Sequence, residues 1–222
     1  MKRILSVCLL VLLLLSLCAC GGNGEEQIRG EQITNNTQPA TEGPEFSLGS
    51  TTGVTYESTF IGIGCNLPEG WTFYTDEQIR QLNNTTADVA GEEYQELMEQ
   101  ATVVYDMYAV AADGLSNMSV NLEKISQIQL LVLDLEENLK KIGPTLQETM
   151  ETMGITDYTY EVGTKTIEGE TFTCLNCHGT ISDIDMYQTI LNIKCNGYLA
   201  SVTLTTFGEN TIDQLLENFY LA

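Results

Sequence analysis

The feature that most constrains the fold is a series of four strand-like segments joined by short turns in the last third of the chain. The segments are Tyr158–Thr166, Thr171–Gly179, Asp185–Cys195 and Tyr198–Thr206. Asn196-Gly197 is a strong signal for a two-residue hairpin, and Glu168-Gly169 marks another turn. Because strands joined by such short connections pair antiparallel, this region predicts an antiparallel meander.

The remaining segments alternate between strands and helices. Strands are expected within Thr55–Leu67, which ends at Pro68-Glu69-Gly70, and in a hairpin formed by Val103–Ala112 and Asn117–Ile125 around Asp113-Gly114. Helices are expected from a capping box at Thr75 and Gln78, over Thr86–Gln100, over Asp134–Met153, and after Asn210 with Ile212, Leu215, Leu216 and Phe219 on one face. Grouped hairpins with helices between them predict an α+β fold, an antiparallel sheet of about six to eight strands packed with helices.

The N-terminus has the pattern of an export signal. Lys2 and Arg3 precede an apolar run, Ile4–Leu17, that is short for a membrane span. The run ends in Leu17-Cys18-Ala19-Cys20-Gly21, which resembles the lipobox of bacterial lipoproteins, with Leu17 and Ala19 in the expected places before Cys20. The resemblance implies cleavage before Cys20 and acylation of that cysteine. The expected location is the outer face of the cytoplasmic membrane.

Three regions follow from this pattern: a signal peptide over 1–19, a lipidated flexible tether over 20–50 and one globular domain over 51–222. The tether is rich in Gly, Asn, Gln, Thr and Glu and has few apolar side chains with which to form a core. Without Lys2 and Arg3, seven basic residues stand against 31 acidic residues, a net charge of −24. Such a charge repels nucleic acid and anionic lipid head groups, and it favours solubility outside the cell.

Leu67-Pro68-Glu69-Gly70-Trp71 follows an early strand and precedes helices and a long meander. This order resembles the Mog1/PsbP-like fold, an α/β/α sandwich. The stretch from Gly62 to Glu77 also resembles a set of uncharacterised lipoproteins of clostridial type. Members of the fold mostly bind other proteins, so the resemblance implies a binding role. We expect Gly70 and Trp71 to be structural, with Trp71 closing one end of the sandwich.

Cys174-Leu175-Asn176-Cys177-His178 is the sequence pattern that most suggests chemistry. It matches the Cys-x-x-Cys-His attachment signature of c-type haem, and it also contains a Cys-x-x-Cys pair. Each of these sites needs both sulfurs on one side, usually on a helix. The flanking residues alternate as in a strand, which predicts that Cys174 and Cys177 point to opposite faces and that His178 lies near solvent. We therefore expect no haem, metal or other cofactor.

The four cysteines of the predicted domain, Cys65, Cys174, Cys177 and Cys195, permit two disulfides in an oxidising compartment, or four free thiols. A turn near Ser182–Asp183 would place Cys174 opposite Leu191 and Cys177 opposite Gln188. Neither cysteine would then face Cys195, so a simple bridge within that hairpin is not expected.

No motif for nucleophilic, zinc-dependent or phosphate chemistry occurs, and His178 is the sole histidine. The sequence therefore favours a non-catalytic module, anchored to the membrane through Cys20, that binds a protein or a cell-envelope component. The alternative is an envelope enzyme, or a redox or metal protein, that uses Cys174, Cys177 and His178.

Overall fold

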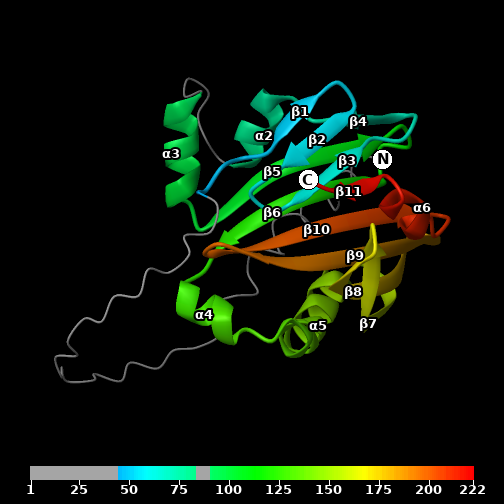
Figure 1. Cartoon of the computed structure of the whole chain (residues 1–222). Coiled ribbons are helices and arrows are strands. Elements are labelled where there is room, and N and C mark those ends of the chain that lie inside the picture. The colour runs from blue at the N-terminus through cyan, green and yellow to red at the C-terminus, as the bar shows by residue number, and fades with distance from the viewer. Residues whose placement is uncertain (1–44, 84–90) are drawn as a thin grey trace, which may run out of the picture.

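The structure, a computed structural model, describes residues 45–83 and 91–222. Within these residues it contains two antiparallel sheets and five helices, which confirms the predicted α+β class (Figure 1). Cys20, the signal peptide and most of the predicted tether lie outside the described residues. None of the described helices is long and apolar enough to cross a membrane.

The larger sheet has seven strands in the order β4-β5-β6-β10-β9-β8-β7. Its strands are β4 (Trp71–Phe73), β5 (Val103–Ala111), β6 (Asn117–Lys124), β7 (Thr156–Ile167), β8 (Glu170–Ile181), β9 (Ile184–Cys195) and β10 (Tyr198–Phe207). The predicted meander is the run β7 to β10, and each of its turns contains two residues. Both residues adopt a positive φ in the first two turns, Glu168-Gly169 and Ser182-Asp183, whereas only Gly197 does so in the third.

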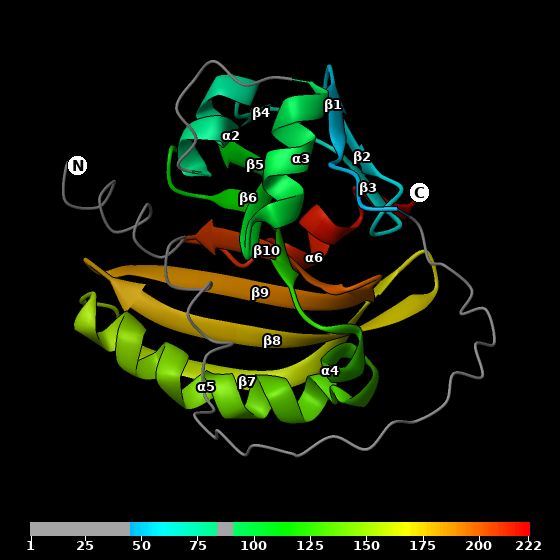
Figure 2. The same ribbon diagram turned by 90° about the vertical axis from the view of Figure 1, so that its left-hand side faces the viewer.

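The smaller sheet has four strands in the order β1-β2-β3-β11. These are β1 (Ser50–Thr52), β2 (Thr55–Ser58), β3 (Ile63–Asn66) and β11 (Phe219–Leu221). Side chains of this sheet, such as Tyr56, Ile63 and Phe219, share one core with β5, β6 and β10 of the larger sheet. The smaller sheet therefore covers one face of the larger sheet, as Figure 2 shows from the side.

The described residues form five helices, α2 (Asp76–Leu82), α3 (Glu92–Gln100), α4 (Gln127–Val132), α5 (Leu135–Thr152) and α6 (Ile212–Leu216). Two of them, α2 and α5, cover the two ends of the face opposite the smaller sheet. Helix α5 packs on β7 and β8, while α2 packs on β5. Helix α6 lies on the other side, in the core shared with the smaller sheet. The large sheet thus has one apolar face and an opposite face whose two ends carry different helices.

Several local predictions are confirmed. Thr75 and Gln78 form the capping box of α2, and the helix predicted over Asp134–Met153 is α5, which Asp134 caps and which contains Pro144. The hairpin of β5 and β6 forms around Asp113-Gly114 as expected. Residues 86–90 of the predicted helix Thr86–Gln100 lie outside the described residues, and α3 accounts for Glu92–Gln100.

Two predictions about the final helix are corrected, its C-terminal end and its N-cap. The final helix ends at Leu216, and Phe219 belongs to β11, where it pairs with Cys65. Phe219 still enters the same core as Leu215. The spacing of its side chain fits a longer helix, but a strand can bury the same side chain. Thr211 takes the N-cap position instead of Asn210, although Asn210 Oδ1 accepts from the backbone N–H of Ile212.

Candidate functional site

The structure separates the two sulfurs of the Cys174-Leu175-Asn176-Cys177-His178 string. The string lies in β8, with Cys174 opposite Leu191 and Cys177 opposite Gln188, as predicted. Cys174 enters the core shared with the smaller sheet, and Cys177 enters the core beneath α5. The pairing of β8 with its neighbours is regular through Asn176, so no bulge turns the sulfurs to one side.

His178 lies on the same face as Cys174 but toward the end of the strand. Its ring is half-exposed, 3.3 Å from Asp185 Oδ1 and beside the ring of Tyr187. The distance and exposure describe a solvated polar pair. Across the described part of the chain, no cluster of three or more His, Cys, Asp or Glu side chains is placed to hold a metal ion.

The other two candidate thiols are also held apart. Cys65 lies in β3 of the smaller sheet, and Cys195 ends β9. All four described cysteines are free thiols. Burial raises the pKa of Cys65, Cys177 and Cys195 to about 12, so at neutral pH these groups are protonated thiols and weak nucleophiles.

Gly70 and Trp71 lie at the start of β4. Gly70 has φ +82°, a conformation that glycine adopts freely in the turn after Pro68. Trp71 pairs with Ala111 and packs against the main core, but its side chain is only half-buried. It contributes to the edge of the core and is more exposed than the sequence suggested.

A set of uncharged polar side chains occupies the centre of the large sheet, on the face opposite the main core. Three strands contribute to this set, which we call the polar stripe: Asn117, Ser119 and Asn121 from β6, Ser201, Thr203 and Thr205 from β10, and Gln188 and Asn192 from β9. The register places them in three rows across the sheet, Asn121-Ser201-Asn192, Ser119-Thr203-Ile190 and Asn117-Thr205-Gln188. All eight are buried except Ser201, which is half-buried.

The outer rows of the polar stripe are partly satisfied by hydrogen bonds along the row. Ser201 Oγ donates to Asn192 Oδ1 at 3.0 Å, and Gln188 Nε2 donates to Thr205 Oγ1 at 3.0 Å. In the middle row, Ser119 Oγ and Thr203 Oγ1 are buried and have no hydrogen-bond partner among the described residues. The same is true of Asn121 Oδ1 and Gln188 Oε1 at two corners of the stripe.

Two different borders flank the polar stripe. On the β5 side, Tyr105 lies opposite Asn121 and Tyr108 opposite Ser119, and both tyrosines pack with side chains of α2 and Tyr74. On the β8 side, Leu175 and Cys177 lie beneath α5. The stripe is therefore a hydrogen-bonding surface three strands wide. Aromatic side chains lie along one edge of it and aliphatic side chains along the other.

A buried carboxyl group lies outside the polar stripe, under the smaller sheet. Asp106 sits at a bulge in β5, where it accepts from the Tyr56 hydroxyl at 2.6 Å and from the Gly49 N–H at 2.8 Å. Burial raises the pKa of Asp106 to about 6, although the two hydrogen bonds oppose the rise. The group joins the first described segment of the chain to the large sheet.

Sequence reasoning missed the polar stripe. In the sequence, the alternation of Asn117, Ser119 and Asn121 with apolar residues is typical of a half-buried strand whose polar side faces water. The same alternation recurs in β10, at Ser201, Thr203 and Thr205. The signal that could have revealed the stripe is this repetition in two strands. It becomes informative only when β6 is known to pair with β10, whose partner residues are 74 to 88 residues apart in the sequence.

No family model matches the chain, and no curated protein matches it. Among solved structures, one similar chain is PA94 of Pseudomonas aeruginosa, a protein of unknown function, with 14% sequence identity and a TM-score of 0.25. The match covers 40% of this chain and 58% of that chain. At these values the likeness carries no argument about function.

Proposed function

We propose that this protein is a non-catalytic binding module, anchored by acylated Cys20 to the outer face of the cytoplasmic membrane, that binds a protein or cell-envelope component through the polar stripe. The anchor is supported by the lipobox around Cys20 and the apolar run before it. The enzyme and redox alternative has less support, because Cys174 and Cys177 enter different cores.

The observation that carries the binding role is the set of four buried polar atoms without partners in the stripe. Folded proteins pair the great majority of their buried polar groups, and an unpaired one costs about 1–3 kcal/mol of stability. Ser119, Asn121, Thr203 and Gln188 place four such atoms on neighbouring strands of one face. A ligand with hydrogen-bond donors and acceptors would satisfy them together after displacing the groups that bury them.

The chemistry of the stripe also limits the ligand. None of its eight side chains is charged, in a chain whose net charge is −22. The stripe therefore suits hydroxyl and amide groups, which glycans and extended peptides both offer. Its width of three strands suits an elongated ligand more than a small ion.

The binding role is tested by capture from a detergent-solubilised envelope fraction of the host. The bait is the chain from residue 20 onward with Cys20→Ser, compared with the same bait carrying Ser119→Ala and Thr203→Val. Thr164→Val on β7, an exposed position outside the stripe, is the matched control. Specific capture should fall at least tenfold in the double variant and stay unchanged in the control. Equal capture by all three baits would refute binding through the stripe.

Anchoring is tested separately by metabolic labelling with a clickable fatty acid. Cys20→Ser should abolish the label, because the acyl acceptor is lost, whereas Cys18→Ser should leave it unchanged. A labelled Cys20→Ser protein would contradict the lipid-anchor assignment without bearing on the stripe.

A further inference from the structure

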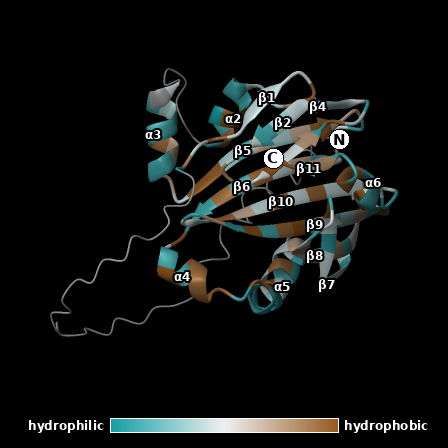
Figure 3. Ribbon diagram, viewed as in Figure 1, coloured by the Kyte–Doolittle hydropathy of each residue, from teal (hydrophilic) through white to brown (hydrophobic). Residues whose placement is uncertain are grey.

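Helix α4 presents an apolar face to solvent. Ile128, Leu131 and Val132 are 76%, 82% and 78% exposed, and their spacing of three and four residues places them on one side of the helix. We call these three residues the α4 patch. Figure 3 shows α4 at the margin of the molecule with much of its ribbon in the hydrophobic colour. Isolated exposed aliphatic residues are common, but three on one short helix mark a contact surface.

The helix is held in this orientation by contacts at both ends. Ser126 and Gln129 form a capping box, and Leu130 is buried against the domain. The Gln127 side chain bonds to Asn196 in the β9–β10 turn, and the Lys194 ammonium donates to the Leu133 carbonyl just after the helix. The α4 patch is therefore a fixed feature of the fold.

Four of the six basic residues within 45–222 are near this helix in sequence or by contact. Lys124 precedes α4 by three residues, the Lys194 ammonium contacts Leu133 just after it, and Lys140 and Lys141 lie in the following helix α5. Asp134, Glu136 and Glu137 are the acidic residues of the segment 124–141, and Glu136 pairs with Lys140. With Lys194 the segment carries a net charge of +1, and with Glu123 and Glu99, whose carbonyl accepts from the Lys124 ammonium, it carries −1. The surface around α4 is therefore far less negative than the chain as a whole, whose net charge is −22.

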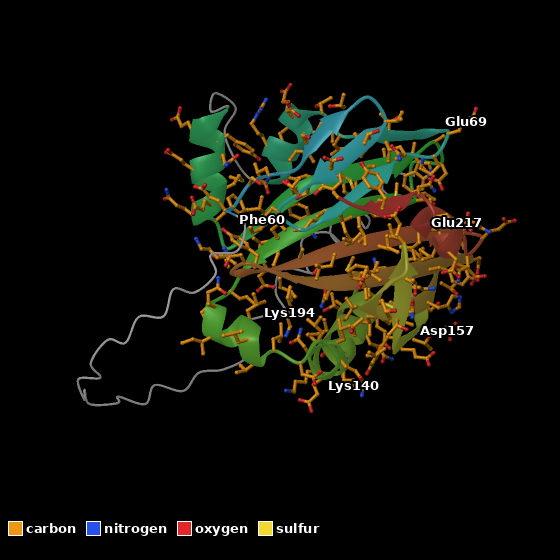
Figure 4. The ribbon with its side chains drawn as sticks, in the orientation of Figure 1. Phe60, Glu69, Lys140, Asp157, Lys194 and Glu217 are labelled. Carbon is orange, nitrogen blue, oxygen red and sulfur yellow. The ribbon has the colours of Figure 1, made fainter. Side chains whose placement is uncertain are left out.

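The α4 patch lies at the end of the domain where the predicted tether enters. Phe46, one of the first described residues, stacks on Tyr198 with ring centroids 4.9 Å apart. Tyr198 pairs with Lys124, two residues before the cap of α4, and the Lys124 ammonium lies 5.9 Å from the Tyr198 ring. Figure 4 shows Phe60, which also contacts Phe46, and Lys194 toward this end, with Glu69, Glu217 and Asp157 toward the other.

The tether's length sets how far this end can move from the anchor. The 27 residues from Cys20 to Phe46 span at most about 90 Å when fully extended. A lipid on Cys20 would thus keep the α4 end near the bilayer at a high local concentration, where even a weak attraction is sufficient for contact.

We propose that the α4 patch is a second, reversible contact with the bilayer surface, an inference that rests on the lipid anchor of the proposed function. Ile128, Leu131 and Val132 would enter the boundary between head groups and acyl chains, as the apolar faces of interfacial helices do. The flanking lysines would reach anionic phosphates of the head groups with their ammonium groups. The contact would hold the domain in one orientation, with the acidic end containing Glu69 and Glu217 away from the membrane.

The test couples Cys20 chemically to a maleimide phospholipid in vesicles of phosphatidylcholine and phosphatidylglycerol at 7:3, so that natural lipidation is not required. Leu131→Trp reports on the α4 patch, and Val54→Trp, at an aliphatic position 59% exposed in the β1–β2 turn, is the matched control. Trp71 is present in both proteins, and its contribution cancels. Acyl-brominated lipid should quench the Leu131→Trp signal at least twofold more than the Val54→Trp signal, and the difference should shrink when phosphatidylglycerol is omitted.

Equal quenching of the two tryptophans would overturn the membrane contact. A blue shift of Leu131→Trp in the soluble protein before vesicles are added would also overturn it, because the patch would then be covered by a second copy of the chain. Either result would leave the Cys20 labelling experiment unaffected, so failure of this contact and failure of the anchor are distinguishable.

Discussion

At the scale of single residues, Asp106 shows how burial links one side chain to the pH dependence of stability. Its pKa rises from 3.8 to about 6 because burial disfavours the charged carboxylate. Burial also raises the pKa of its partner Tyr56 well above 10, so the tyrosine hydroxyl remains a donor throughout the acidic range. The folded state therefore binds more protons than the unfolded state between pH 4 and 6.

We predict that Asp106 makes the free energy of unfolding fall as the pH rises. Its stabilising contribution is complete below pH 3.8 and is lost as the pH rises through about 6. The loss amounts to about 3 kcal/mol, since one pKa unit corresponds to about 1.4 kcal/mol. Urea unfolding at pH 4 and pH 7 should show this change in the wild type relative to Asp106→Asn. A constant difference between the two proteins across this range would show that Asp106 does not titrate as described.

At the scale of elements, the β7–β8 hairpin depends on a glycine that fits against an irregular neighbour. The pairing of β7 with β8 shifts register between Thr156 and Thr159, where Asp157 has φ +51°. Gly179 of β8 faces this irregularity, and a Cβ there would lie 2.6 Å from Ile155 Cγ2 and 3.1 Å from Tyr158 Cδ2. Both neighbours are buried side chains with little room to move.

Gly179→Ala should therefore lower the free energy of unfolding by about 1–3 kcal/mol, the usual cost of overpacking. Gly163→Ala in β7 is the matched control, because its Cβ would meet only the Asn176 amide, at 3.0 Å. Chemical denaturation gives the free energy of unfolding of both variants, and the loss should be larger for Gly179→Ala. A Gly179→Ala protein as stable as Gly163→Ala would mean that α5 and β7 yield more easily than their packing suggests.

The elements show which parts of the fold a sequence can predict. Local signals succeeded where they act within a few residues, as at the Thr75 capping box, the Ser182-Asp183 turn and the register of Cys174. Helix α4 was missed because its apolar residues face solvent and it is only six residues long. Strand β11 was missed because Phe219 satisfies a helical spacing while pairing with a distant strand.

At the scale of the whole molecule, the site was harder to predict than the fold. The cysteine string is compact in sequence and therefore suggests a site, but in the sheet its two sulfurs lie in different cores. The polar stripe is compact only in space, since its members come from three strands between residues 117 and 205. Four of its eight members carry an unpaired buried atom, which no local pattern of residues reveals.

We propose that the unpaired atoms of the polar stripe lower the stability of the free protein and are satisfied when the ligand binds. Thermal unfolding of the protein tests this most directly. Ser119→Ala with Thr203→Val removes two unpaired buried hydroxyls, so the free double variant should be more stable than the wild type by about 1 kcal/mol or more, or at least 2–4 °C. A ligand at 100 times its dissociation constant adds about 2.7 kcal/mol to a protein that binds it. When the ligand is present, the wild type should therefore melt at a higher temperature than the double variant, the reverse of their order without ligand.

The measurement is the fluorine resonance of 5-fluorotryptophan at Trp71, the chain's sole tryptophan, followed through thermal unfolding with and without the detergent-solubilised envelope fraction. We predict that the fraction raises the melting temperature of the wild type by about 5–10 °C and leaves the double variant unchanged. The variant would then melt above the wild type alone and below it in the fraction. An equal rise in both proteins, or a free variant that melts below the wild type, would contradict the account.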